Sequence, residues 1–213
     1  MKPFAPDLRT IPAVILAGGR SSRMGSNKAF ALLGGETLLS RVARRIAAQA
    51  ATVALNADAG WPDPLGLDIV PDTVEGKAGP LAGVLAALLH TAARHPGASY
   101  VATVAVDSPF FPHDLIGRLA AALESADDIA VATCEGRDHP VFGLWPVSVA
   151  EDLRHFIAED EKRRVSGFLE RHATRRVDFA ALDTPAGRLD PFFNVNAPDD
   201  LVAARAWLEV LER

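Results

Sequence analysis

The chain has 213 residues, of which 49% are hydrophobic and 23% charged, a size and composition that suit one domain over residues 1–213 with a continuous core. Its formal net charge of -5 excludes a global basic field, so we expect no nucleic acid and no membrane surface as partner. The single cysteine, Cys134, excludes an internal disulfide framework and a multi-cysteine metal site, and no apolar run is long enough for a signal peptide or a membrane span. We therefore expect a cytoplasmic protein.

Short apolar or β-branched runs alternate with helical patterns along the chain. The runs that predict strands lie at residues 13–17, 52–56, 68–70, 100–106, 129–133 and 141–145. Helices are predicted at 38–50, 81–93 and 115–123, and the turn-rich segments 57–66 and 183–191 are predicted to be surface loops. This alternation predicts an α/β fold of three layers, with helices on both faces of a mostly parallel sheet.

In such sheets ligands bind beyond the carboxyl ends of the strands. The side chains that follow the predicted strands are therefore the first candidates for a site. They include Gly18 and Gly19 after the first strand, Asn56 after the second, Asp72 after the third and Asp107 after the fourth.

The segment GGRSSRMGSNK after the first strand combines glycines, hydroxyls and the cations Arg20, Arg23 and Lys28. Glycines let backbone N–H groups approach an anion, and the cations can neutralise phosphate charge, so the loop suits a triphosphate. It fits neither the Walker A motif nor G-x-G-x-x-G. The alternative is an ordinary solvated loop, because Gly, Ser and Arg are common loop residues.

The string LAGGRSSRMGSNK at residues 16–28 resembles the signature loop of nucleotidyltransferases that activate sugar phosphates, isoprenoid phosphates and molybdopterin. Within that superfamily, Leu-Ala-Gly-Gly at 16–19 is most similar to the molybdenum cofactor guanylyltransferases. Four further segments resemble theirs: GPLAG at 79–83, VDSP at 106–109, HPVFGLW at 139–145 and FFNVNAPDDL at 192–201. The resemblance implies a three-layer, Rossmann-like nucleotidyltransferase fold.

The resemblance also implies roles for particular residues. It assigns guanine recognition to the backbone of residues 16–19 and phosphate contacts to Arg23 and Lys28, with Asp107 binding Mg²⁺. The residues implied for GTP are Leu16, Ala17, Gly18, Gly19, Arg23, Lys28, Asn56, Asp72, Gly79 and Asp107. Those implied for the molybdopterin side are His139, Arg164, Asn194 and Asn196.

Several of these residues have structural alternatives. Asp107 precedes Ser108-Pro109 and could start a turn, although a carboxylate at a strand end also suits a divalent cation. Asp72 could cap a turn, and Gly79 could serve only to begin a helix at Pro80. His139-Pro140 is interpreted as a substrate-side loop, and Lys162-Arg163-Arg164 could be a charge-paired helix surface.

The reaction that the resemblance implies transfers GMP from GTP to the phosphate of molybdopterin, the molybdenum cofactor, and releases pyrophosphate. Arg23, Lys28 and Asp107 would be the catalytic residues, and Mg²⁺ the cofactor. Molybdenum-insertion proteins and molybdoenzyme chaperones are the implied protein partners. The alternatives are a CTP-dependent molybdopterin enzyme, a sugar-phosphate nucleotidyltransferase, or a non-catalytic nucleotide or cofactor carrier.

Overall fold

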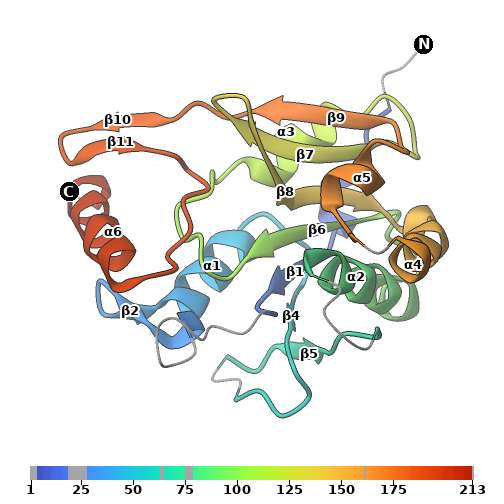
Figure 1. Cartoon of the computed structure of the whole chain (residues 1–213), viewed down its shortest axis with the longest axis horizontal. Helices are drawn as coiled ribbons and strands as arrows, with labels where there is room; N and C mark the ends of the chain where they lie inside the picture. The colour runs from blue at the N-terminus through green and yellow to red at the C-terminus, as the bar shows by residue number, and fades with distance from the viewer. Residues whose placement is uncertain (1–3, 19–27, 63–64, 75–78, 161, 213) are drawn as a thin grey trace.

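The computed structural model describes residues 4–18, 28–62, 65–74, 79–160 and 162–212 (Figure 1). Within these ranges a seven-stranded sheet forms the middle of the molecule, in the spatial order β5-β4-β1-β6-β8-β7-β9. Its strands are β1 (Ala13–Leu16), β4 (Val53–Asn56), β5 (Asp68–Val70), β6 (Tyr100–Ala105), β7 (Ile129–Cys134), β8 (Arg137–Pro146) and β9 (Thr174–Asp178). No helix in the described ranges is long and apolar enough to cross a bilayer.

The strands β5, β4, β1 and β6 run parallel, and β7 and β9 also pair in parallel. Only β8 is antiparallel to its neighbours in this sheet. Parallel neighbours need crossover connections long enough to hold a helix, which the alternating sequence pattern supplies. The prediction of an α/β fold with a mostly parallel sheet is therefore confirmed.

Helices cover both faces of the sheet. The described helices are α1 (Leu38–Ala47), α2 (Pro80–Arg94), α3 (Leu115–Ala121), α4 (Ala150–Glu159), α5 (Val165–Leu169) and α6 (Pro198–Leu211). One apolar cluster joins the sheet to α1 and α3, and a second joins its other face to α2, α4 and α5. These two clusters make the three layers that the sequence pattern predicts.

Helix α1 shows how sequence sets one of these contacts. The Thr37 hydroxyl accepts a hydrogen bond from Ser40 N (3.1 Å) and caps the first turn. Leu39, Val42 and Ile46 then recur at helical spacing, and all three are fully buried against the sheet. Exposed Arg44 lies on the opposite side of the same helix.

A third apolar cluster lies at the end of the molecule where α6 meets the hairpin β2 (Leu32–Leu33) and β3 (Glu36–Thr37). A second hairpin, β10 (Leu182–Thr184) and β11 (Gly187–Leu189), lies near α6 in Figure 1. The prediction of a plain loop at 183–191 is therefore wrong. The predicted loop at 57–66 contains Trp61, which is half-buried, and its ring packs 5.9 Å from that of Phe30.

Other boundaries differ in detail. The helices predicted at 38–50 and 115–123 end at Ala47 and Ala121, and β8 begins at Arg137 rather than at residue 141. His139 therefore lies within a strand, so its interpretation as a loop residue is wrong.

Candidate active site

Three neighbouring strands deliver polar residues to one edge of the sheet. Leu16 is in register with Asn56 on one side and with Ala105 on the other, so β1, β4 and β6 end at the same level. Backbone bonds continue past the strand ends, with Ala17 N donating to Asn56 O (3.0 Å) and Val106 N to Leu16 O (3.1 Å). Asp107 therefore emerges beside the point where the glycine-rich segment begins.

Lys28 meets Asp107 at this edge. The residue begins a 3-10 helix, η2 (Lys28–Phe30), and its Nζ donates to Asp107 Oδ2 and to Asn196 Oδ1, the latter at 3.1 Å. The Asp107 side chain is 9% exposed and that of Lys28 is 22% exposed, so little water screens the pair. The structure thus joins an ammonium, a carboxylate and an amide from three distant parts of the chain.

The segment 194–196 is fastened to the strand end by several hydrogen bonds. Val195 N donates to Asp107 O (2.8 Å), and Ser108 Oγ donates to Asn194 Oδ1 (2.5 Å). Asp200 at the start of α6 accepts from Asn196 N at 2.8 Å. These bonds fix the backbone that presents Asn196 to Lys28.

Asn56 and Asp72 form a second polar group on this edge. The Asn56 side chain is buried, and its Nδ2 donates to Val70 O (2.9 Å) and to Asp72 Oδ1 (2.8 Å). A Cβ built on Gly83 of α2 would lie 2.6 Å from Asn56 Oδ1, whereas one on Gly18 would lie 3.5 Å away. Asn56 therefore occupies a gap that exists because α2 has a glycine there.

The start of α2 contributes backbone rather than side chain. Gly79 precedes Pro80 with φ 63° and ψ -157°, a conformation that favours glycine. Proline at the first helical position costs no hydrogen bond, because the first N–H groups of any helix lack an intrahelical partner. Of these groups, Ala82 N donates back to Gly79 O (3.2 Å). Asp72 and Gly79 are both exposed.

His139 is buried behind this edge. Its side chain is 9% exposed, and its Nε2 lies 3.3 Å from Asp190 Oδ2 without hydrogen-bond geometry. Burial lowers the pKa of His139 below the usual 6.5, and the Asp190 carboxylate opposes that shift only in part. The imidazole ring packs 4.8 Å from that of Phe192, and Phe192 O in turn accepts from Ser108 Oγ (3.3 Å). His139 thus packs on Phe192, which precedes the segment 194–196 in the chain.

Among the described residues, no hydrogen bond or ion pair links Arg164 to the cluster around Asp107. It occupies the cap position before α5, and its carbonyl accepts from Phe168 N at 3.3 Å. Helix α4 ends at Glu159, and Arg163 has a φ of 46°. The alternative of a charge-paired helix surface at 162–164 is therefore wrong, and a role for Arg164 toward molybdopterin stays a prediction.

The other predicted site residues divide into two groups. Leu16 and Ala17 are buried at the end of β1, and Gly18 is exposed just beyond them. Gly19 and Arg23 lie outside the described residues. Sequence reasoning missed Gly83 and Asp200, although an acidic residue three positions after Ala197 is a capping signal that pointed to Asp200.

The oxygen donors at this edge fit the Mg²⁺ that the sequence predicts. Mg²⁺ in phosphate-transfer sites is held by one or two carboxylates, with substrate phosphates and water as further ligands. Asp107 supplies one carboxylate, and Asn194 and Asn196 supply amide oxygens nearby. Within the described ranges no group of three or more His, Cys, Asp or Glu forms a protein-only metal cage.

Comparisons with known proteins agree with this geometry. The model of the MobA-like NTP transferase domain matches residues 13–177. A molybdenum cofactor guanylyltransferase of Rhizobium rhizogenes is 60% identical over 214 residues, covering 100% of this chain and 99% of that protein.

Two solved structures share the fold. The crystal structure of molybdopterin-guanine dinucleotide biosynthesis protein A from Archaeoglobus fulgidus has a TM-score of 0.69 at 20% identity, covering 93% of this chain and 99% of that one. Rv0371C of Mycobacterium tuberculosis, in complex with manganese, has a TM-score of 0.60 at 20% identity, covering 91% and 97%. By the family model and the identity of its relative, this chain belongs to the MobA-like NTP transferase family, among the molybdenum cofactor guanylyltransferases.

Proposed function

We propose that this chain transfers GMP from GTP to the terminal phosphate of molybdopterin, with release of pyrophosphate. The observation that carries the proposal is the cluster of Lys28, Asp107 and Asn196 at the carboxyl edge of the sheet. It adjoins the glycine-rich segment that follows β1, where a triphosphate is expected. The name of the 60% identical relative supports guanine as the base and the molybdenum cofactor as the acceptor.

The reaction needs one displacement at phosphorus. An oxygen of the acceptor phosphate bonds to the α-phosphorus of GTP, and the bond from that phosphorus to the bridging oxygen of the β-phosphate breaks. The electron pair leaves with pyrophosphate. A phosphate monoester is already ionised at neutral pH, so no general base is required, and positioning and charge neutralisation supply the catalysis.

Lys28 and Asp107 have complementary tasks in this scheme. Lys28 is held by Asp107 and Asn196 before substrate arrives, so its ammonium is already at the edge where phosphate charge accumulates. Asp107 would hold Mg²⁺ together with the substrate phosphates, and the cation would supply Lewis-acid stabilisation of phosphate charge when bound. The manganese in the Mycobacterium tuberculosis structure supports a divalent cation for this fold.

Asn56, Asp72 and the backbone of residues 16–18 would hold the nucleoside. Asn56 Oδ1 faces the gap between Gly18 and Gly83, while its Nδ2 is taken by Val70 and Asp72. We place the molybdopterin side at Asn194 and Asn196, with His139 behind them and Arg164 as a more distant candidate. The single cysteine is a buried thiol, which agrees with a reaction in the cytoplasm.

The test incubates the purified chain with GTP labelled at the α-phosphate, Mg²⁺ and molybdopterin. We expect the label in the dinucleotide cofactor and an equal amount of unlabelled pyrophosphate. We expect little product when CTP replaces GTP. GTP binding without pyrophosphate release at saturating molybdopterin would instead indicate a carrier, and equal use of CTP would contradict the assigned base.

Lys28→Met tests the catalytic cluster. Loss of a preorganised cation should lower kcat by about 10²- to 10³-fold, because the developing charge on pyrophosphate loses a partner. Lys162→Met is the matched control, since Lys162 is exposed between α4 and α5. Steady-state kinetics of both variants would contradict the assignment if Lys28→Met kept the kcat of its control.

A further inference from the structure

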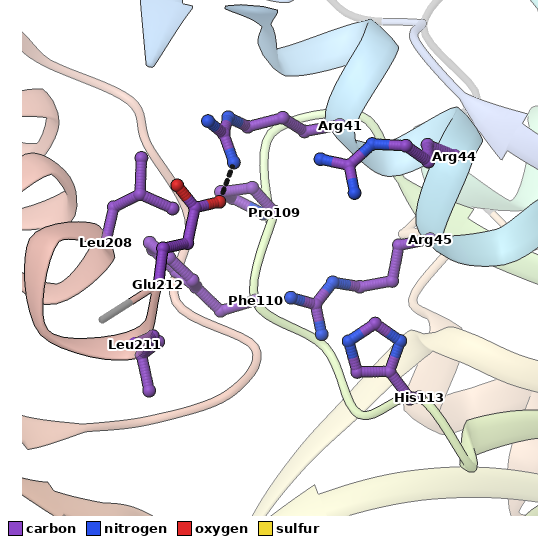
Figure 2. Close-up of a pocket in the computed structure, with 9 residues that line it drawn as sticks. All are labelled: Arg41, Arg44, Arg45, Pro109, Phe110, His113, Leu208, Leu211 and Glu212. Carbon is purple, nitrogen blue, oxygen red and sulfur yellow. Dashed lines mark hydrogen bonds and ion pairs between the residues drawn. The ribbon is translucent and has the colours of Figure 1, made fainter. Parts of the chain in front are cut away.

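A pocket lies between α1, the segment that follows Asp107, and the end of α6 (Figure 2). Its volume is about 240 Å³. Arg41, Arg44 and Arg45 from α1 line one side, and Glu212 lines the side toward α6. Lys28, Asp107 and the asparagines of the candidate active site are not among its lining residues, so the pocket is a separate feature of the fold.

The pocket has an excess of positive charge. Among the lining residues three arginines face one glutamate, in a chain whose formal net charge is -5. The charge of Arg41 is balanced by Glu212, because Arg41 Nη1 donates to Glu212 Oε1 at 2.8 Å. A second carboxylate, that of Glu36, lies outside the lining and pairs with Arg44 at 3.0 Å, which leaves one positive charge. The remaining charge is that of Arg45, which has no carboxylate partner in the part of the chain that the structure describes. The guanidinium groups of Arg44 and Arg45 both extend from α1 toward the pocket in Figure 2.

Arg45 is the more constrained of the two. It is half-buried, and its Nη1 donates to the carbonyl oxygen of Phe111 (2.9 Å), which carries no formal charge. Burial lowers the pKa of Arg45, and the charges of Arg44 and Arg41 lower it further. Burial and the charges of Arg45 and Arg44 also lower the pKa of His113 across the pocket. Clustered cations that repel one another are stabilised when an anion binds between them.

The other wall of the pocket is apolar. Phe110, Leu208 and Leu211 line it, and the Phe110 ring is held edge-on by Trp207 with a centroid distance of 6.3 Å. Leu211 is 45% exposed, so part of this apolar wall is open to solvent and to a ligand. A ligand that satisfies both walls must carry an anionic group at one end and an apolar group at the other.

We propose that this pocket binds an organic phosphate monoester, with the phosphate on Arg44 and Arg45 and the organic group against Leu208 and Leu211. Guanidinium groups present forked N–H donors that match phosphate oxygens. A phosphate here would offset the charge of Arg45 and compete with exposed Glu36 for Arg44. The proposal does not depend on the transferase reaction.

The test titrates phenyl phosphate and inorganic phosphate into the full chain and follows backbone amide resonances in ¹H–¹⁵N spectra. We expect phenyl phosphate to shift resonances of residues 41–45, 109–113 and 208–212, with higher affinity than inorganic phosphate because of the apolar wall. A Lys28→Met background should leave these shifts in place, which separates this pocket from the candidate active site.

Arg44→Gln should weaken phenyl phosphate about tenfold, and Arg44→Glu should abolish the shifts. Arg94→Gln and Arg94→Glu are matched controls, because Arg44 and Arg94 are 64% and 65% exposed and each pairs with one carboxylate. Shifts confined to the Lys28 region, or equal loss of affinity in the Arg44 and Arg94 variants, would overturn the proposal. Equal affinity for phenyl phosphate and inorganic phosphate would also overturn the proposal.

Discussion

Gly83 sets the room available to Asn56. An alanine Cβ at this position would lie 2.6 Å from Asn56 Oδ1 and 3.2 Å from Leu16 Cδ2. Asn56 has little freedom to move away, because its Nδ2 is bonded to Val70 O and Asp72 Oδ1. The lack of a side chain at Gly83 of α2 is therefore required by the proposed nucleoside site.

Gly83→Ala should weaken GTP binding about tenfold and lower the free energy of unfolding by about 1–3 kcal/mol, because Asn56 must leave its position. Isothermal titration calorimetry gives the Kd, and urea unfolding gives the stability. Gly117→Ala is the matched control, since Gly117 lies in α3 and an added Cβ would contact nothing within 4 Å. That control should gain up to about 1 kcal/mol in stability and keep the Kd. An unchanged Kd for Gly83→Ala would remove Asn56 from the site.

Individual candidate site residues could be predicted from the sequence more readily than the contacts between them. Lys28 and Asp107 could both be predicted at the sheet edge, because each follows a strand or a glycine-rich loop. That Lys28 also bonds to Asn196, 168 positions later, could not be predicted, since only the folded backbone brings the two together. Gly83 was equally hidden, because a glycine in a helix does not reveal which side chain it makes room for.

At the scale of elements, the prediction was best where strands are buried on both faces. Nearly every residue of β1, β6 and β7 is buried, and the apolar runs that form these strands could be recognised in the sequence. β9 reads TRRVD and lies at the edge of the sheet, so its charged residues masked it. The strands of the hairpin β10–β11 have three residues each, too few for an alternating pattern.

β8 was predicted to begin at residue 141, because the apolar run starts there. The structure accommodates Pro140 at a bulge, where the register shifts between Val131 and Ala132 of the neighbouring β7. Gly143 pairs with Val131 on one side of the shift, and His139 pairs with Ala132 on the other. The bulge therefore explains why His139 was mistaken for a loop residue.

Asp128 fastens the turn before β7 to the edge strand β9. Its buried carboxylate accepts from Glu124 N (2.9 Å), Ser125 Oγ (2.6 Å) and Arg175 Nε (2.7 Å). Burial alone would raise the pKa of Asp128, but these hydrogen bonds and the charge of Arg175 lower it from 3.8 to about 2. Because the folded-state pKa is depressed, the stabilisation is present above pH 3.8 and is lost as pH falls toward about 2.

Asp128→Asn should therefore lower the free energy of unfolding by about 2 kcal/mol at neutral pH, and the difference from the parent chain should shrink below pH 3.8. Urea unfolding over a pH series measures both effects. Asp127→Asn is the control, because Asp127 is exposed and its carboxylate accepts one long hydrogen bond, from exposed Ser148 Oγ (3.2 Å). A constant difference between the Asp128 variant and the parent at all pH values would contradict the role of its charge.

At the scale of the whole molecule, the last part of the chain contributes residues to the candidate site. The family model ends at residue 177, yet Asn194 and Asn196 lie beyond it and bond to Ser108 and Lys28. The third apolar cluster fastens α6 to the hairpin β2–β3, which leads directly into α1. A ligand bound at the proposed site would therefore contact segments from both halves of the sequence, and its binding energy should add to the stability of the whole fold.

GTP with Mg²⁺ should raise the melting temperature of the chain. At a GTP concentration of about 100 Kd the native state gains about 2.7 kcal/mol, which corresponds to roughly 5–10 °C for a protein of this size. Differential scanning calorimetry measures the shift. Chelation of the divalent cation should reduce the shift, because the Mg²⁺ that Asp107 would hold no longer neutralises the charge of the triphosphate. CTP should give a smaller shift than GTP, because the phosphate contacts are shared and only the base contacts differ. Equal shifts with CTP and GTP would mean that the sheet edge binds triphosphate without selecting guanine, and base choice would then have to arise when molybdopterin binds.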